Sequence, residues 1–235
     1  LPYHQLRDID KAAEYLYQAL KQQQKFLIVG DYDVDGATST ALMMRVLRAF
    51  GAENVDYLIP DRFVCGYGLT PKIIELAENF NPDLIITVDN GISNLKGVLA
   101  ANKAGFKVVI TDHHLCSGDL PEAEAIVNPN QPNDEFPSKN MAGVGVCFYL
   151  LLGLRQYLRQ QGWFEQQTIP EPKLVDLLDL VALGTVADVV PLDRLNRTLV
   201  TLGVARMRNA LACAGIKALI QVAGKQTAQL ATTDL

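Results

Sequence analysis

Short apolar runs alternate with helical patterns over the first 130 residues, and this alternation constrains the fold more than any other feature. The runs are rich in β-branched and bulky apolar residues, as buried strands are, and they cover residues 26–30, 55–60, 84–88, 107–111 and 125–128. Helical patterns separate most of them, at 37–50, from about Thr70, and at 93–104. Strands that alternate with helices at this spacing build βαβ units. We therefore predict an α/β fold with a parallel twisted sheet and helices on both faces.

The rest of the chain has a different pattern. Apolar residues recur at helical spacing over 8–23, where Asp8 or Asp10 can cap a helix, and again over 143–160, 173–183 and 191–208. We expect an N-terminal helix in 1–24, the parallel α/β core in 25–140 and a mostly helical part of the same domain in 141–210. Residues 211–235 are expected to begin a connection to a further domain.

Composition restricts the class of protein. The chain has 235 residues, of which 49% are hydrophobic, with a net charge of −5 that gives no support for nucleic-acid binding. Four scattered cysteines, without a C-x-x-C pair, argue against a disulfide framework and a structural zinc site. There is no signal pattern and no apolar stretch long enough to span a bilayer. The chain begins with Leu1, which suggests an excised fragment, and we expect a cytoplasmic, soluble protein.

Three segments with acidic and histidine side chains follow predicted strands: GDYDVDG (30–36), VDNG (88–91) and TDHH (111–114). Ligands of open α/β sheets bind outside the carboxyl ends of the strands, so these segments should converge. Asp31, Asp33 and Asp35 alternate, and carboxylates crowded in this way repel one another unless a positive charge holds them ionised. A divalent cation is the simplest such charge.

Each segment also has a purely structural explanation. The aspartates after the first strand can cap a helix, Asp89-Asn90-Gly91 can form a turn, and His113 and His114 can pack behind a capping Asp112. Three such coincidences at one sheet edge are much less probable than one, and we favour the metal site. Carboxylate and imidazole ligands without thiolate suit Mn²⁺ or Mg²⁺, and the mixed set favours Mn²⁺.

A fourth segment, LGTVADVVPL (183–192), places Asp188 among apolar residues. A carboxylate in such surroundings needs a partner. The structural alternative is a helix cap before the helix entered through Pro191, a role for which Asp193 is better placed.

These segments together resemble the DHH phosphoesterase superfamily, and in particular its RecJ branch of single-strand-specific 5′→3′ DNA exonucleases. The resemblance rests on residues 30–40, 59–69, 87–93, 111–114, 142–146 and 184–192, which occur in the family's order. It implies two divalent cations, with Mn²⁺ favoured and Mg²⁺ as the alternative. It also implies that this chain carries the N-terminal catalytic half, since RecJ proteins continue into further domains.

The resemblance also assigns roles to residues. It implies one ion on Asp33 and Asp89, with Asp31 assisting where many members have a histidine, and a second ion on Asp35, Asp89, His113 and Asp188. Asp112 would orient a histidine, and His114 would face the scissile phosphate to stabilise charge or protonate the leaving group.

The loop DRFVCGYG (61–68) offers candidates for substrate binding. Arg62 can grip a phosphate and Tyr67, beside Gly68, can stack on a base, although a surface arginine and a packed tyrosine are the structural alternative. Gly143 and Gly145 can open a helix N-terminus to phosphate, or allow close helix packing.

The function expected first is a metal-dependent hydrolase of phosphoester bonds that degrades single-stranded DNA by activating water. Alternatives are a DHH enzyme for short oligonucleotides, cyclic dinucleotides or pyrophosphate, a non-catalytic scaffold that binds DNA or partners, and a haloacid-dehalogenase-type phosphatase. The expected partner is single-stranded DNA, with neither a membrane nor an organic cofactor, and other repair proteins remain open.

Overall fold

The sheet has five strands, all parallel, in the order β2-β1-β3-β4-β5. The computed structural model describes all 235 residues except the side chains of Arg62 and Val64. The strands are β1 (Phe26–Val29), β2 (Val55–Leu58), β3 (Leu84–Val88), β4 (Lys107–Thr111) and β5 (Ala125–Val127). Each of the five predicted strands is present within a residue or two of its predicted bounds. The predicted α/β fold with a parallel sheet is confirmed.

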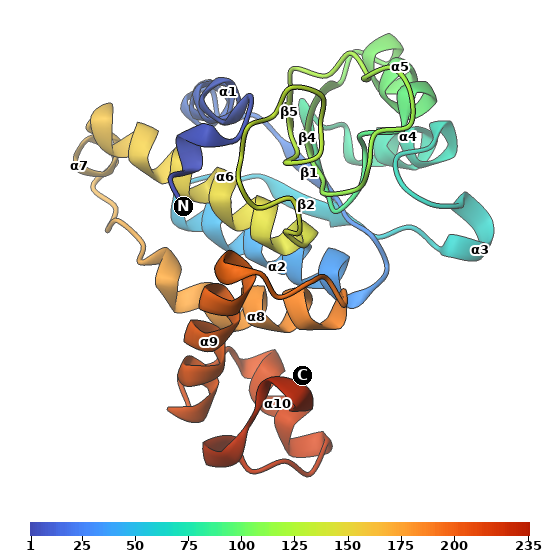
Figure 1. Cartoon of the computed structure of the whole chain (residues 1–235). Coiled ribbons are helices and arrows are strands. Elements are labelled where there is room, and N and C mark those ends of the chain that lie inside the picture. The colour runs from blue at the N-terminus through green and yellow to red at the C-terminus, as the bar shows by residue number, and fades with distance from the viewer.

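Helices cover both faces of the sheet because successive strand residues point to opposite sides. Phe26 and Ile28 of β1 pack in one apolar core, with α1 (Ile9–Lys21), α2 (Val34–Ala49) and α6 (Gly143–Gln160). Leu27 and Val29 pack in a second core, with α4 (Pro71–Ala77) and α5 (Leu95–Lys103). Figure 1 shows the two layers on either side of the strands.

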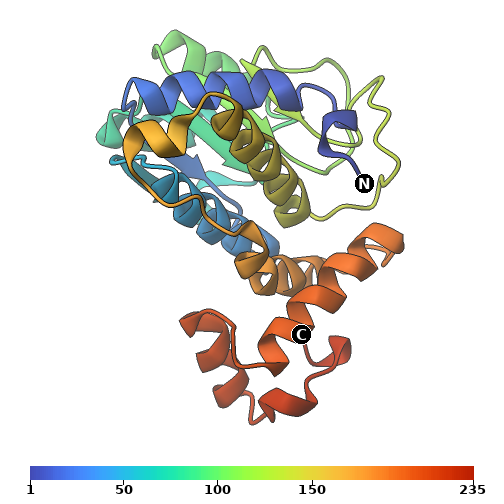
Figure 2. The same ribbon diagram turned by 90° about the vertical axis from the view of Figure 1, so that its left-hand side faces the viewer.

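The helical part begins with α6 and continues away from the sheet, where α8, α9 and α10 form the lower part of Figure 2. Its bounds are α6 as predicted, α7 (Trp163–Gln167), α8 (Leu178–Ala187), α9 (Arg194–Arg208) and α10 (Ala214–Val222). Short 3₁₀ helices complete the chain at η1 (Tyr3–Gln5), η2 (Glu78–Phe80), η3 (Leu174–Leu177), η4 (Thr227–Gln229) and η5 (Thr232–Asp234). The buried Asp179 of α8 accepts a hydrogen bond from Cys213 N at 2.6 Å and thereby ties α10 to α8.

Several helix bounds differ from prediction for local reasons. Helix α2 begins at Val34, three residues early, because the Asp33 side chain caps it by accepting from Gly36 N at 2.8 Å. Asp8 stands at the N-cap position of α1, but its carboxylate accepts from Ile126 N of β5 at 3.4 Å and caps nothing. The segment predicted as a helix over 173–183 is a 3₁₀ turn followed by α8. The short helices α3 (Arg62–Cys65), α7 and α10 were not predicted.

Among the described residues, no helix is both long enough and apolar enough to cross a lipid bilayer.

Helix α9 approaches α8 closely at Gly203, and this contact provides a test of the packing. A Cβ at position 203 would lie 2.2 Å from Leu178 O and 2.4 Å from Ala182 Cβ, so backbone would have to move. We expect Gly203→Ala to lower the free energy of unfolding by about 3 kcal/mol, measured by urea denaturation. Gly215→Ala in α10, where a Cβ meets nothing within 4 Å, is the matched control and should cause no loss. Equal stability of both variants would contradict the close packing of α9 on α8.

Candidate metal centre

The functional segments meet where the order of the strands reverses. From the central pair β1 and β3 the chain leaves to opposite faces, through α2 and α5, which opens a crevice at the carboxyl ends of these strands. Asp31, Asp33 and Asp35 follow β1, Asp89 follows β3, and His113 follows β4. The topology of the sheet therefore brings together side chains that are far apart in the sequence, such as Asp31 and His113, which are separated by 82 positions (113 − 31).

His113 is the centre of the cluster. Its Nε2 atom lies 3.1 Å from Asp89 Oδ1, 3.5 Å from Asp188 Oδ2 and 4.0 Å from Asp35 Oδ2. Asp188 reaches this point from the C-terminal end of α8, while Asp193 caps α9 by accepting from Asn196 N at 3.0 Å. The alternative of a capping role for Asp188 therefore does not apply.

Three atoms of this cluster are buried and have no hydrogen-bond partner within the described part of the chain: His113 Nε2, Asp89 Oδ1 and Asp188 Oδ2. Leaving buried polar atoms unpaired is costly, most of all on carboxylates. Ligand atoms lie within 4.8 Å of one another in three groups, namely Asp89-His113-His114, Asp35-His113-Asp188 and Asp31-Asp33-Asp89. Oxygen and imidazole donors that converge in this way fit divalent cations such as Mn²⁺ or Mg²⁺.

The pKa values of the buried carboxylates point to the same need for positive charge. Burial, together with the Asp33 carboxylate, raises the pKa of Asp89 to about 9. Burial and the neighbouring Asp89 carboxylate raise the pKa of Asp35 well above its usual value, and burial also raises the pKa of Asp188. Without a cation these groups favour the protonated form, and a bound cation replaces the proton.

The N-terminus of α6 holds Asp35. Gly143 N and Val144 N donate to the two carboxylate oxygens of Asp35 at 2.6 and 2.9 Å. A Cβ at position 143 would lie 2.6 Å from Asp89 Oδ1, whereas at Gly145 it would meet only Met141, with Cε at 3.4 Å. The glycine at 143 thus serves close packing, and the first amides of α6 bind a carboxylate of the chain itself.

The backbone around Asp89 is bent into an unusual conformation. Asp89 has φ = 63°, in the left-handed region, and Gly91 follows with φ = 123°. Asn90 Nδ2 donates to Val88 O at 2.9 Å and to Val29 O at 3.2 Å, so this side chain joins the ends of β3 and β1. The segment is a turn, as its sequence indicates, and the turn is what holds the Asp89 carboxylate in the crevice.

The Asp112 carboxylate binds the imidazole of His114, whereas it contacts His113 only through the backbone N–H of that residue, which donates to Asp112 Oδ1 at 2.7 Å. Asp112 Oδ1 lies 2.7 Å from His114 Nδ1, and Asp112 Oδ2 accepts from Ile92 N at 2.9 Å. Burial alone would raise the pKa of Asp112, but the hydrogen bonds from His114 and Ile92 outweigh it and hold this pKa below its usual value. The hydrogen bond to Asp112 in turn raises the pKa of His114 to about 9, so this imidazole is protonated at neutral pH.

Tyr67 lies against the same imidazole. Its hydroxyl group donates to Asp89 O at 3.2 Å, and the hydroxyl oxygen lies 3.2 Å from Nδ1 and 3.1 Å from Nε2 of His114, with the two rings edge to face. Tyr67 therefore contacts the site through its hydroxyl, which its sequence-based role as a stacking platform did not include. Gly68 has φ = 70°, and a Cβ there would lie 2.5 Å from Asn94 Oδ1, so it shapes this loop. The side chain of Arg62, the remaining candidate, lies outside the described residues.

Sequence reasoning missed two asparagines that support the histidine pair. Asn130 Nδ2 donates to His113 O at 2.6 Å, and Asn128 Nδ2 donates to His114 O at 3.0 Å. Both asparagines follow β5, which is the neighbour of β4 in the sheet. Their position directly after a predicted strand was the feature of the sequence that could have identified them as site residues.

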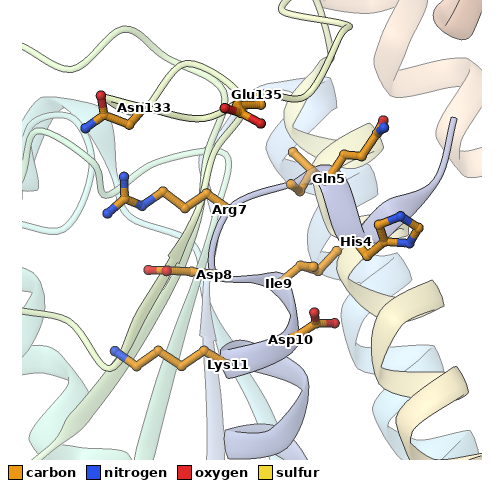
Figure 3. Close-up of a pocket in the computed structure, with 10 residues that line it drawn as sticks. His4, Gln5, Arg7, Asp8, Ile9, Asp10, Lys11, Asn133 and Glu135 are labelled. Carbon is orange, nitrogen blue, oxygen red and sulfur yellow. The ribbon is translucent and has the colours of Figure 1, made fainter.

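The third histidine lies elsewhere, beside a cavity of about 420 Å³ near the N-terminus. Figure 3 shows that Arg7, Asp8 and Lys11 extend to one side of this segment, while His4 and Gln5 extend to the other. Arg7 N donates to Asp134 Oδ2 at 2.7 Å and Arg7 Nη1 to Pro132 O at 3.0 Å. These contacts attach the N-terminal segment to the loop after β5, and the side chains do not converge on a common point.

Fold and site together define a parallel α/β domain with a candidate centre for divalent cations at its switch point. The family described as "DHH family, N-terminal domain" matches residues 25–185. The chain therefore belongs to the DHH family.

Among the relatives, the single-stranded-DNA-specific exonuclease RecJ of Salmonella typhimurium is 52% identical over 235 residues, which cover 100% of this chain and 41% of that protein. A crystal structure of exonuclease RecJ bound to manganese matches with a TM-score of 0.79 at 36% identity, over 97% of this chain and 54% of that one. RecJ of Thermus thermophilus in complex with Mg²⁺ matches with a TM-score of 0.61 at 30% identity, over 94% of this chain and 26% of that one. This chain thus spans about two fifths of the length of curated relatives such as the Salmonella protein.

The raised pKa of Asp89 predicts how pH and cations act on stability. A carboxyl group whose pKa is higher in the folded than in the unfolded chain stabilises the fold at low pH, and loses this contribution as the pH rises from about 4 to 9. In EDTA we expect the melting temperature to fall over this range, and Mn²⁺ to raise it more at pH 8.5 than at pH 6. Asp89→Asn should flatten the dependence. A Mn²⁺ effect equal at both pH values would contradict the proton–cation exchange.

Gly143 and Gly145 form a matched pair for testing the site. A Cβ at 143 would displace Asp89, so we expect Gly143→Ala to weaken Mn²⁺ binding by more than about tenfold in calorimetric titration. Gly145→Ala meets only a flexible methionine and should stay within about twofold of the unchanged chain. Equal affinities of the two variants would show that the approach of α6 to Asp89 does not control the site.

Proposed function

We propose that this chain is the catalytic core of a metal-dependent phosphodiesterase that degrades single-stranded DNA from its 5′ end. The observation that carries the proposal is the convergence of three buried, unpaired ligand atoms, on His113, Asp89 and Asp188, at the switch point of the sheet. The similarity to RecJ exonucleases over the whole chain supports the substrate class, and the family resemblance supports the 5′ polarity.

The candidate ligands divide into two sets that share Asp89. Asp31 and Asp33 complete an all-oxygen set, and Asp35, His113 and Asp188 complete a mixed set. Manganese, the ion in the RecJ structure that matches with a TM-score of 0.79, suits both sets, and magnesium is the alternative. A pair of such cations held by these residues would lower the pKa of a water molecule and offset the charge of the phosphate.

His114 provides a second positive charge in this proposal. Asp112 accepts from Nδ1, which leaves the Nε2 proton of this half-exposed imidazole available to a further acceptor. With a pKa of about 9, the imidazolium keeps this proton at neutral pH. It can donate a hydrogen bond to a phosphate oxygen in the transition state, or give its proton to the leaving oxygen.

Asp112 and Tyr67 act on the reaction through His114. Asp112 is buried and accepts four hydrogen bonds, three from backbone N–H groups and one from His114 Nδ1, and this fixed carboxylate orients the imidazole. The Tyr67 hydroxyl oxygen accepts from the protonated ring while its own proton is donated to Asp89 O, and so links the histidine to the metal-binding turn. Such supporting contacts typically change activity about 10- to 100-fold when they are removed.

The relatives' action on DNA also favours a location. Bacterial DNA lies in the cytoplasm, and the four cysteines of this chain are all free, as expected in a reducing compartment. We propose the cytoplasm as the site of action.

The proposal is tested by Asp89→Asn, which keeps the shape of the side chain and removes the charge shared by both ligand sets. We expect release of mononucleotides from single-stranded DNA in Mn²⁺ to fall more than about 100-fold, because both sets lose a ligand. The measurement is chromatography of the products, with melting curves to establish that the variant is folded.

Asp119→Asn, an exposed carboxylate in the loop after β4, is the matched control and should retain full activity. Unchanged activity of Asp89→Asn would refute the proposal. Faster turnover of two-nucleotide or cyclic substrates than of long strands would instead assign the chain to a phosphoesterase of short oligonucleotides.

A further inference from the structure

Four large apolar side chains are exposed on the segments that carry the residues of the candidate metal centre or of the Tyr67 loop. They are Val34, Phe63, Leu115 and Val189, with exposed fractions of 44, 92, 78 and 85%. We call this set the apolar rim. Exposed apolar side chains scattered singly are common on proteins, so it is the position of these four that calls for an explanation.

The position of the rim follows from the covalent chain. Val34 comes directly after Asp33, Leu115 directly after His114, and Val189 directly after Asp188, so the Cα atoms in each pair are about 3.8 Å apart. Phe63 lies in α3, four residues before Tyr67, whose hydroxyl contacts His114. Three separate segments thus place an exposed apolar residue directly after a residue of the site, and α3 adds Phe63 four residues before Tyr67.

Val189 supplies an independent argument that the rim contacts something. It has φ = 60°, a conformation that strains a β-branched residue, and it follows α8 at the position where helices commonly carry glycine. Its side chain is 85% exposed, so the strain is not offset by burial within this chain. A glycine would adopt this backbone conformation without strain. The presence of valine is therefore better explained by a contact with a ligand than by packing within the chain.

We propose that the apolar rim binds the bases of a nucleic-acid strand whose phosphodiester lies in the metal centre, and that it selects unpaired over paired strands. A phosphodiester bound in the crevice has a nucleoside attached on at least one side, and this nucleoside must lie beside the residues that flank the site. Unpaired bases offer apolar faces to such side chains, whereas bases in a duplex are stacked and paired. A folded protein seated on all four positions would close the crevice to its substrate.

This inference rests on the proposed phosphodiesterase function, since it takes the centre as the place of the phosphate. Hydrolysis of a phosphodiester does not by itself depend on the bases. The inference therefore assigns part of the preference for single strands to this domain, through Phe63, Leu115 and Val189.

The test compares two strands with the same phosphates. Labelled oligothymidylate and an abasic oligomer of equal length, both with phosphorothioate linkages to slow hydrolysis, are titrated in Mn²⁺ and followed by fluorescence anisotropy. Loss of a base–aromatic stack typically weakens binding at least about fivefold, so Phe63→Ser should weaken oligothymidylate binding by this factor or more and leave the abasic oligomer unchanged. Leu115→Ser and Val189→Ser should act in the same direction. Val222→Ser, at an 88% exposed valine of α10, is the matched control and should change neither.

Val189→Gly separates side chain from backbone. It should melt at the same temperature as the unchanged chain or higher, because strain is relieved, and yet bind oligothymidylate more weakly. The proposal is overturned if the rim variants weaken both oligomers equally, if they weaken neither, or if Val222→Ser has the same effect. Anisotropy does not depend on turnover. Discrimination by the rim without hydrolysis would therefore count against the proposed function alone, and hydrolysis without discrimination against the rim alone.

Discussion

The mutual repulsion of buried carboxylates is the constraint on which the rest of this structure depends. Asp35, Asp89 and Asp188 approach one imidazole nitrogen of His113, and burial raises the pKa of all three carboxyl groups. A fold would gain stability by replacing such groups with apolar residues of similar size. Protonation can relieve the repulsion but leaves three ligand atoms unpaired, whereas a divalent cation would both offset the carboxylates and bind those atoms.

The fold holds the repelling carboxylates in place with features that are common to parallel α/β sheets, namely adjacent strand ends and a helix N-terminus. Strand ends place Asp31 and Asp89 side by side, since β1 and β3 are neighbours in the sheet. The positive N-terminus of α6 then holds the Asp35 carboxylate with two amides, which keeps one repelling group in a fixed geometry. Close approach of α6 requires Gly143 against Asp89, so helix packing and site geometry are the same contact.

The sequence was sufficient for the parts of the structure that depend on local pattern. All five strands and the motifs at their ends were predictable, because apolar runs and the acidic residues that follow them are visible in the local sequence. The resemblance assigned Asp112 to orient a histidine, but which histidine it binds, the hydroxyl contact of Tyr67 and the support from Asn130 were not predictable. These depend on how loops from β2, β4 and β5 fold over one another, which no spacing encodes. Helix α10 was not predicted; it is held by Ile216 and Ile220, which pack in the main core, and by Asp179, which accepts from Cys213 N 34 residues away.

The structural explanation of these motifs is compatible with the metal site that we predict. Asp33 does cap α2, and Asp89-Asn90-Gly91 does form a turn, as the simplest interpretation of each motif holds. A cap fixes the carboxylate of Asp33 at the first turn of a helix, and a left-handed residue fixes that of Asp89 over the sheet edge. Metal ligands need such fixation, because a carboxylate free to rotate would turn away from its like-charged neighbours toward water. Local backbone structure is therefore the means by which this chain holds the repelling carboxylates close together. A residue that caps a helix or forms a turn here can also be a metal ligand, because the cap or turn fixes the position of its carboxylate.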